Sequence, residues 1–143
     1  VAPVYIVNGN PLVGLFKMFI PLKMFIKTNN QKFMKKVMNV LFSEYDGFAL
    51  EFMSTTFQYC NMDFSPLPVI SKDSAKNIKT PISIFAAEKD IMFPGNKMIK
   101  RAKDIFPSLI ETVVFKNTKH VPSNENFIVI ERLILKNGTQ NHE

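Results

Sequence analysis

The chain has 143 residues, of which 46% are hydrophobic and 21% are charged, a composition typical of a globular domain and not of a disordered segment. Its single cysteine, Cys60, excludes an internal disulfide framework and gives no metal-binding spacing. The net charge of +6 comes mainly from dispersed lysines, which we interpret as solvated helix faces because arginine clusters and nucleic-acid-binding motifs are absent.

The first third of the chain predicts a strand followed by helices. We expect a strand over Val4–Val7 and a helix from Leu12 to Phe19 that Pro21 kinks or ends. A second helix is predicted over residues 31–42, where apolar residues recur every four positions. Charged residues and Pro21 interrupt the apolar segment 11–26, so it does not predict a membrane span.

The middle of the chain predicts a third helix and then an irregular connection. Asp46 is a suitable N-cap for a helix that carries Phe48, Phe52, Met53 and Phe57 along one side. Proline residues break the periodicity after about residue 61. Ser71 then predicts the cap of a short helix that ends near residue 78.

From Pro81 onward the pattern is strand, turn, helix, strand, turn, helix, which is typical of parallel α/β units. The strands are predicted over residues 81–87 and 111–116. The helix between them begins after Pro94 and ends at Pro107, and its buried stripe should consist of Met98, Ile99, Ala102, Ile105 and Phe106. Ser123 should cap a last helix that continues to about Asn137 and presents Phe127, Ile130 and Ile134 on one face.

An acid and an imidazole follow the two predicted strands. Asp90 comes after the first strand and the turn Glu88–Lys89, and His120 comes after the second strand and a turn over residues 117–119. The separation of 30 residues (120 − 90) accommodates one helix and one strand, so the two loops should emerge side by side at one edge of a parallel sheet. A carboxylate that orients an imidazole would allow the imidazole to accept a proton from a hydroxyl nucleophile.

Spacing alone leaves another interpretation open. Asp90 could simply terminate a turn, and His120 could be an ordinary loop histidine. Residues 81–90, followed by Phe93–Pro94 and later by Lys119-His120-Val121-Pro122, resemble the C-terminal part of the α/β-hydrolase superfamily. That resemblance implies a triad in the chain order serine, acid, histidine, with Asp90 as the acid and His120 as the base.

The resemblance is best over residues 79–136 and implies a wider organisation. Residues 1–9 look like a core strand, 10–68 look like an inserted α-helical cap, and 69–143 look like the C-terminal part of the hydrolase core. Ala87 and Lys119 depart from the family, which usually has glycine at these positions.

None of the five glycines builds a Gly-x-Ser-x-Gly nucleophile elbow. We therefore expect the nucleophile and the oxyanion hole to lie upstream of Val1, and the chain alone to be inactive. We expect it to form an oligomer or to pair with a missing N-terminal segment. Cys60 is interpreted as structural, Ser71 as a cap, and His142 as part of a polar tail.

The helical region is rich in phenylalanine and methionine, which either pack against one another or line an apolar pocket. A pocket of that kind would suit a small-molecule carboxylic ester with an apolar acyl group. We expect no cofactor, no metal, no nucleic acid partner and no membrane contact, and a cytoplasmic location. Two alternatives remain: a non-catalytic truncated hydrolase-like module that binds a partner or an anionic membrane, and an inactive remnant.

Overall fold

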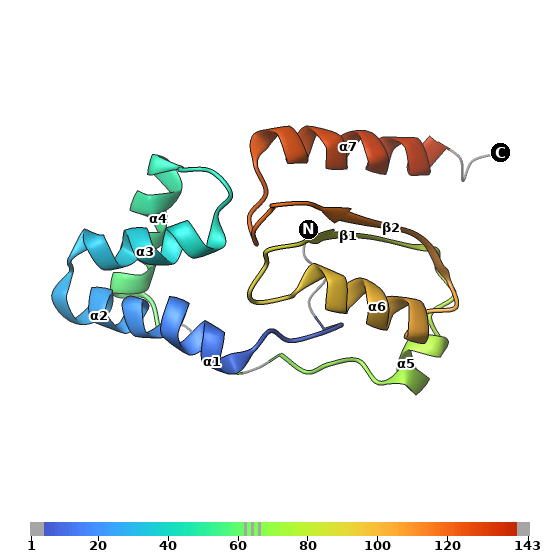
Figure 1. Ribbon diagram of the computed structural model, residues 1–143, viewed down its shortest axis with the longest axis horizontal. Helices are drawn as coiled ribbons and strands as arrows, with labels where there is room; N and C mark the ends of the chain where they lie inside the picture. The colour runs from blue at the N-terminus through green and yellow to red at the C-terminus, as the bar shows by residue number, and fades with distance from the viewer. Residues whose placement is uncertain (1–4, 62, 64, 66, 140–143) are drawn as a thin grey trace.

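A two-stranded parallel sheet lies between helices, and a group of further helices lies at one end of it (Figure 1). The computed structural model describes residues 5–61, 63, 65 and 67–139. Helix α6 (Gly95–Ile105) covers one face of the sheet, and α7 (Asn124–Thr139) lies over the other (Figure 1). The expected mixed α/β architecture is therefore confirmed.

The sheet is one strand-helix-strand unit. Strand β1 (Ile82–Ala87) pairs in parallel with β2 (Leu109–Phe115), and the chain between them passes through α6. A parallel pair needs such a crossover because the second strand must begin at the same end as the first. The register places Ala87 opposite Phe115, so both strands end together and both following loops emerge at the same edge.

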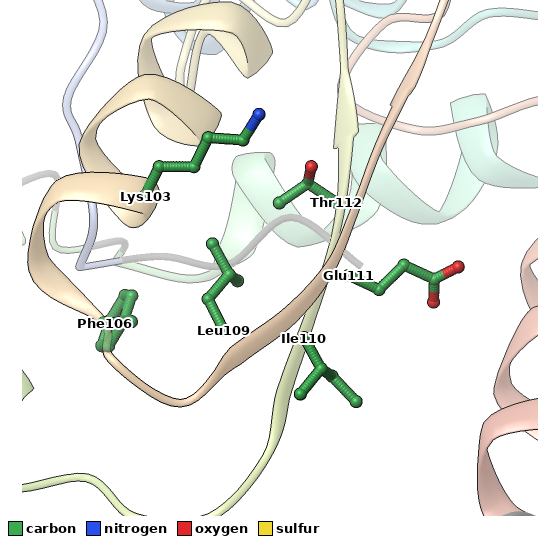
Figure 2. A pocket seen from close by; sticks show the side chains of 6 residues that line it. All are labelled: Lys103, Phe106, Leu109, Ile110, Glu111 and Thr112. Carbon is green, nitrogen blue, oxygen red and sulfur yellow. The ribbon is translucent and has the colours of Figure 1, made fainter.

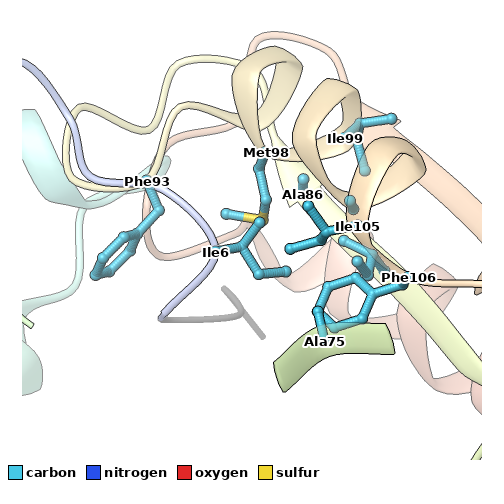
Figure 3. Packing of buried hydrophobic residues seen from close by; sticks show 10 residues of the cluster. Ile6, Ala75, Ala86, Phe93, Met98, Ile99, Ile105 and Phe106 are labelled. Carbon is cyan, nitrogen blue, oxygen red and sulfur yellow. The ribbon is translucent and has the colours of Figure 1, made fainter. Parts of the chain in front are cut away.

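Helix α6 packs on the sheet through the predicted stripe. Met98, Ile99, Ala102 and Ile105 are all buried, and the following Phe106 joins the same cluster. Figure 3 shows Met98, Ala86 and Ile105 close together, with Ile6 from the beginning of the chain beside them. Burying this apolar stripe removes it from water and holds α6 against the sheet.

The last helix begins at its predicted cap, but its predicted apolar face is only partly buried. Ser123 Oγ accepts a hydrogen bond from Asn126 N at 3.3 Å, which confirms the cap. Ile130 is buried at 5% exposure, whereas Phe127 and Ile134 are 45% and 53% exposed. Only part of the apolar face of α7 is thus covered by the described chain.

The first helices form a separate packed group at the end of the sheet (Figure 1). Pro21 does not end the predicted helix, because α1 (Pro11–Gly14) continues through the π-helical turn Leu15–Phe19 into α2 (Ile20–Thr28). A π turn inserts an additional residue, and here it ends at Phe19, two residues before Pro21, whose nitrogen has no N–H to donate to a regular α-helical hydrogen bond. The expected disruption at Pro21 is therefore a local change of winding.

Helices α3 (Gln31–Leu41) and α4 (Gly47–Tyr59) occur where the sequence predicted them. Asp46 caps α4, since its Oδ1 accepts a hydrogen bond from Ala49 N at 2.9 Å. Buried residues from α2 and α3 pack together with Met18 of the π-helical turn. They are Leu22, Phe25, Met34, Val37, Met38 and Leu41.

The expected opening strand is not found over the described residues 5–9, and Val4 lies outside the described part of the chain. A strand requires a continuous ladder of hydrogen bonds, but this segment makes isolated backbone bonds to loops. Ile70 N donates to Tyr5 O at 2.7 Å, and Gly9 N donates to Met92 O at 2.7 Å. The segment nevertheless contributes Ile6 to the core.

The short helix α5 (Lys72–Lys76) begins after Ser71, whose Oγ accepts from Ser74 N at 3.1 Å as predicted. It ends two residues before the expected Ile78. Lys72 donates a hydrogen bond to Asp104 of α6 at 2.7 Å, and this bond lowers the pKa of the Asp104 carboxyl. Within the described residues, none of the helices has the length and hydropathy to cross a bilayer.

Gly95 allows α6 to approach β1 closely. A Cβ at this position would lie 2.6 Å from Ala87 O, whereas one at Gly14 would meet only Phe19 Cε2 at 3.8 Å. We expect Gly95→Ala to lower the free energy of unfolding by about 1–3 kcal/mol because backbone atoms must move. Gly14→Ala should be neutral or stabilise by about 0.5–1 kcal/mol. Urea denaturation measures both, and equal stability of the two variants would contradict the close-packing argument.

Candidate active site

Asp90 lies in the tight turn that follows β1. Its carboxylate is almost fully buried, with 1% of the side chain exposed. One carboxylate oxygen, Oδ1, accepts hydrogen bonds from Met92 N at 2.7 Å and from Phe93 N at 3.0 Å. This turn satisfies two backbone donors and fixes the direction of the second oxygen, Oδ2.

His120 lies in the loop after β2, and the structure confirms that this loop lies beside the Asp90 loop. Lys89 N donates to Thr118 O at 2.8 Å, and Glu88 N donates to Phe115 O at 3.0 Å. Glu88 Oε2 accepts a hydrogen bond from Asn117 N at 2.8 Å. Asn117 has a φ of 56°, in the left-handed region that asparagine adopts more readily than most residues. Three hydrogen bonds therefore connect the two turns before the side chains meet.

The imidazole and the carboxylate meet directly. His120 Nδ1 lies 2.9 Å from Asp90 Oδ2, and the His120 side chain is 28% exposed. An ionised carboxylate can only accept, so Nδ1 must carry the proton and Nε2 of a neutral ring keeps its lone pair. No residue in the described ranges hydrogen-bonds to Nε2. The arrangement can therefore orient a base toward a further group.

The backbone support of this pair was not predicted from the sequence. The amides of Met92 and Phe93 hold Asp90, and the ring of Phe93 lies 5.7 Å from the His120 ring, centroid to centroid. Gly9 packs against the same turn so closely that a Cβ would collide with Ile91 O. The tendency of aspartate to hydrogen-bond the amide two residues later was the available signal.

Two residues stand where the α/β-hydrolases that the sequence resembles usually have glycine, and neither disturbs its turn. Ala87 and Lys119 lack a positive φ, so neither position demands glycine. Lys119 instead uses its side chain, whose Nζ donates to Asn39 O at 2.6 Å.

An apolar cavity of about 420 Å³ lies between the start of the helical group and the Asp90 turn. Its walls include Met18, Phe19, Leu67, Ile91, Met92 and Phe93. Phe93 thus contacts both the cavity and the His120 ring. Among the described phenylalanines and methionines of the helical region, Met18 and Phe19 line this cavity, while Phe25, Met34 and Met38 form the core between helices.

A smaller hollow of about 240 Å³ lies at the opposite end of β2, near Lys103, Phe106 and Leu109. In Figure 2, Lys103 comes from α6 and Glu111 points to the other side of the strand. Because Asp90 and His120 follow the far ends of the strands, this hollow is not part of the candidate site.

Other reactive side chains lie elsewhere. Cys60 is an exposed free thiol at the end of α4, and Ser54 is buried with its hydroxyl donating to Gln31 Oε1 at 3.1 Å. His142 lies outside the described residues. In the described part of the chain, no group of three or more His, Cys, Asp or Glu side chains could hold a metal ion.

No protein-family model and no curated protein sequence matches this chain. Solved structures do match it. The carboxylesterase CesB from Bacillus subtilis has a TM-score of 0.66 and 15% identity, over 94% of this chain and 48% of that one. The naproxen esterase of the same organism has a TM-score of 0.64 and 16% identity, over 82% and 44%.

A serine hydrolase from Cycloclasticus zankles also matches, with a TM-score of 0.57 and 16% identity, over 94% of this chain and 52% of that one. The fold is that of an α/β-hydrolase. The chain spans about half the length of these α/β-hydrolase structures.

The buried acid of this α/β-hydrolase fold should be sensitive to loss of charge. Asp90→Asn keeps the size of the side chain but replaces one carboxylate oxygen with an NH₂ group. Both carboxylate oxygens accept hydrogen bonds here, whereas an NH₂ group can only donate. We expect the free energy of unfolding to fall by about 1–3 kcal/mol, because a buried donor loses its acceptor. Asp73→Asn is the control, since that side chain is 95% exposed, and it should change stability by no more than about 0.5 kcal/mol. Chemical denaturation decides between these values, and an Asp90→Asn protein as stable as the control would contradict the bonding described.

Proposed function

We propose that Asp90 and His120 are the orienting acid and the general base of a serine hydrolase that acts on carboxylic esters. The observation that carries this proposal is the 2.9 Å contact between His120 Nδ1 and the buried Asp90 Oδ2 at the ends of two adjacent parallel strands. The 143-residue sequence contains no Gly-x-Ser-x-Gly elbow, and we assign the nucleophile and oxyanion hole to residues outside it.

The proposed chemistry begins with proton transfer to His120 Nε2 from the serine hydroxyl as its oxygen attacks the ester carbonyl. Asp90 would stabilise the imidazolium and hold the ring in the required tautomer. The imidazolium would then return the proton to the leaving alcohol, and a water molecule would hydrolyse the acyl-enzyme by the same route. The burial of Asp90 supports this role, because a desolvated carboxylate interacts more strongly with an imidazolium than an exposed one does.

The fold supports the same organisation. We propose that residues 10–68 act as a helical cap and that residues 1–9 and 69–143 belong to the hydrolase core, to which Ile6 contributes a buried side chain. The helical group lies at the end of the sheet where the loops after β1 and β2 emerge (Figure 1), as a cap over the site would. Two of the solved structures with this fold are described as carboxylesterases.

The cavity supports an apolar group on the ester. Its volume of about 420 Å³ is within the range of small-molecule sites, and its lining is mainly apolar. Because Phe93 contacts both the cavity and the His120 ring, a group bound there would lie near the proposed base. An acyl chain or aromatic ring has the required chemistry.

The catalytic assignment is tested with the full-length protein. His120→Ala should lower kcat for ester hydrolysis by about 10⁴- to 10⁶-fold and should slow labelling by a serine-reactive phosphonate, because the base is lost. The matched control is His142→Ala, at the second histidine of the 143-residue sequence, which should retain full activity. If the unaltered protein is not labelled at all, the enzyme proposal is rejected.

The acyl specificity is tested by narrowing the cavity. Met18→Trp should raise KM for long-chain esters by about 10-fold or more, because the larger side chain leaves less room in the cavity for a long acyl chain. KM for short-chain esters should not change, because a short acyl group does not reach the cavity. Met24→Trp is the control, because Met24 lies on α2, is 39% exposed and does not line the cavity. A native preference for short polar esters would contradict an apolar pocket.

A second candidate is a non-catalytic module that binds an anionic membrane. It is favoured by the exposure of Leu12 and Phe16, at 63% and 66%, beside the exposed Lys17 and Lys23 on the same continuous helix. Binding to acidic vesicles that weakens with salt, in a protein that no phosphonate labels, would favour this function over hydrolysis.

A further inference from the structure

The residues on both sides of His120 are hydrogen-bonded to the end of α3. Val121 N donates to Leu41 O at 2.8 Å, and Ser43 N donates to Val121 O at 2.9 Å. On the other side, Lys119 N donates to Ser43 Oγ at 2.9 Å. The backbone of His120 therefore lies between two residues that are anchored to the same short segment, residues 41–43.

Two more contacts use the ends of helices. The Lys119 ammonium donates to Asn39 O at 2.6 Å, in the last turn of α3. The carbonyls of that turn have no partner within the helix and carry partial negative charge, so a cation there is stabilising. At the other end of the loop, Asn124 N at the start of α7 donates to Glu44 Oε2 at 3.2 Å. The contacts of residues 119–124 with residues 39–44 form one continuous clamp.

The imidazole is thus fixed from two directions. Asp90 holds the ring from the hydrolase core through Nδ1, and the clamp holds the backbone from the helical group. We propose that Ser43 and Lys119 are positioning residues for His120, and this inference rests on the proposed catalytic role of that histidine. Neither side chain is assigned contact with substrate.

His120 needs this positioning because proton transfer tolerates little change in the distance between the base and the hydroxyl. A base must be within hydrogen-bond reach of the hydroxyl, and a displacement of about 1 Å can lower the rate about 100-fold. The Asp90 contact alone leaves the ring able to rotate about the Nδ1–Oδ2 direction. Fixing Lys119 and Val121 removes much of the remaining backbone freedom and so determines where Nε2 points.

The first test needs no catalytic activity. NMR of the full-length protein follows the His120 Nδ1–H proton and its exchange with water, with assignment from a His120→Gln spectrum. Ser43→Ala and Lys119→Met should each accelerate this exchange by about tenfold, because each removes one supporting hydrogen bond. The His120 ring nitrogen shifts should move as well.

Matched controls come from the same helical group. Ser54→Ala removes a serine hydrogen bond to α3, and Lys36→Met removes an exposed lysine of α3, but neither contacts the histidine loop. These variants should leave the His120 signal unchanged. If Ser43→Ala and Lys119→Met alter only stability, as the controls do, and not the imidazole signal, the positioning role is overturned.

The second test uses ester hydrolysis by the full-length protein. Ser43→Ala and Lys119→Met should lower kcat by about tenfold with little change in KM, and Ser43→Thr and Lys119→Arg should restore most of the rate because they keep the hydroxyl and the cation. An inactive full-length protein would reject the proposed hydrolysis, and the NMR result would then decide the positioning role alone. An active protein with unaltered kcat in both variants would overturn the positioning role and leave the hydrolase intact.

Discussion

The buried carboxylate of Asp90 receives hydrogen bonds from Met92 N, Phe93 N and His120 Nδ1, and the arrangement of both loops follows from keeping all three. A carboxylate that is 1% exposed has almost no water to replace a lost donor. The turn after β1 and the loop after β2 therefore have few alternative arrangements, since any displacement of either leaves charge unsatisfied in the interior.

The surrounding scaffold supports this acid by close backbone contact. Gly9 packs against Ile91 on one side of the Asp90 turn, and Gly95 packs against Ala87 on the other. Because β1 and β2 end opposite each other, the loop after β2 brings His120 to the same edge of the sheet as Asp90. Small residues in the scaffold thus permit a polar contact that larger ones would displace.

Much of this architecture could be predicted from the sequence because its signals are local. The strand-helix-strand unit, the buried stripe of α6 and the caps at Asp46, Ser71 and Ser123 each depend on residues a few positions apart. The adjacency of Asp90 and His120 followed from parallel topology. The π-helical turn before Pro21 was not predicted, because a proline indicates disruption without specifying its form.

Long-range contacts were beyond sequence reasoning for a different reason. Lys119 and its partners Asn39 and Ser43 are separated by 80 and 76 residues, and neither composition nor periodicity indicates such a pair. The opening segment likewise depends on its neighbours: residues 5–9 are apolar enough for a strand, but they contact loops and make no ladder.

The clamp between α3 and the histidine loop also limits how this fold can be recombined. Helix α3 ends against the backbone that carries His120. A chimera that received a foreign helical segment would lose acceptors for Lys119 and Val121, so only donors with the same helix end would be interchangeable. The end of α3 and the loop that carries His120 would therefore have to be exchanged together.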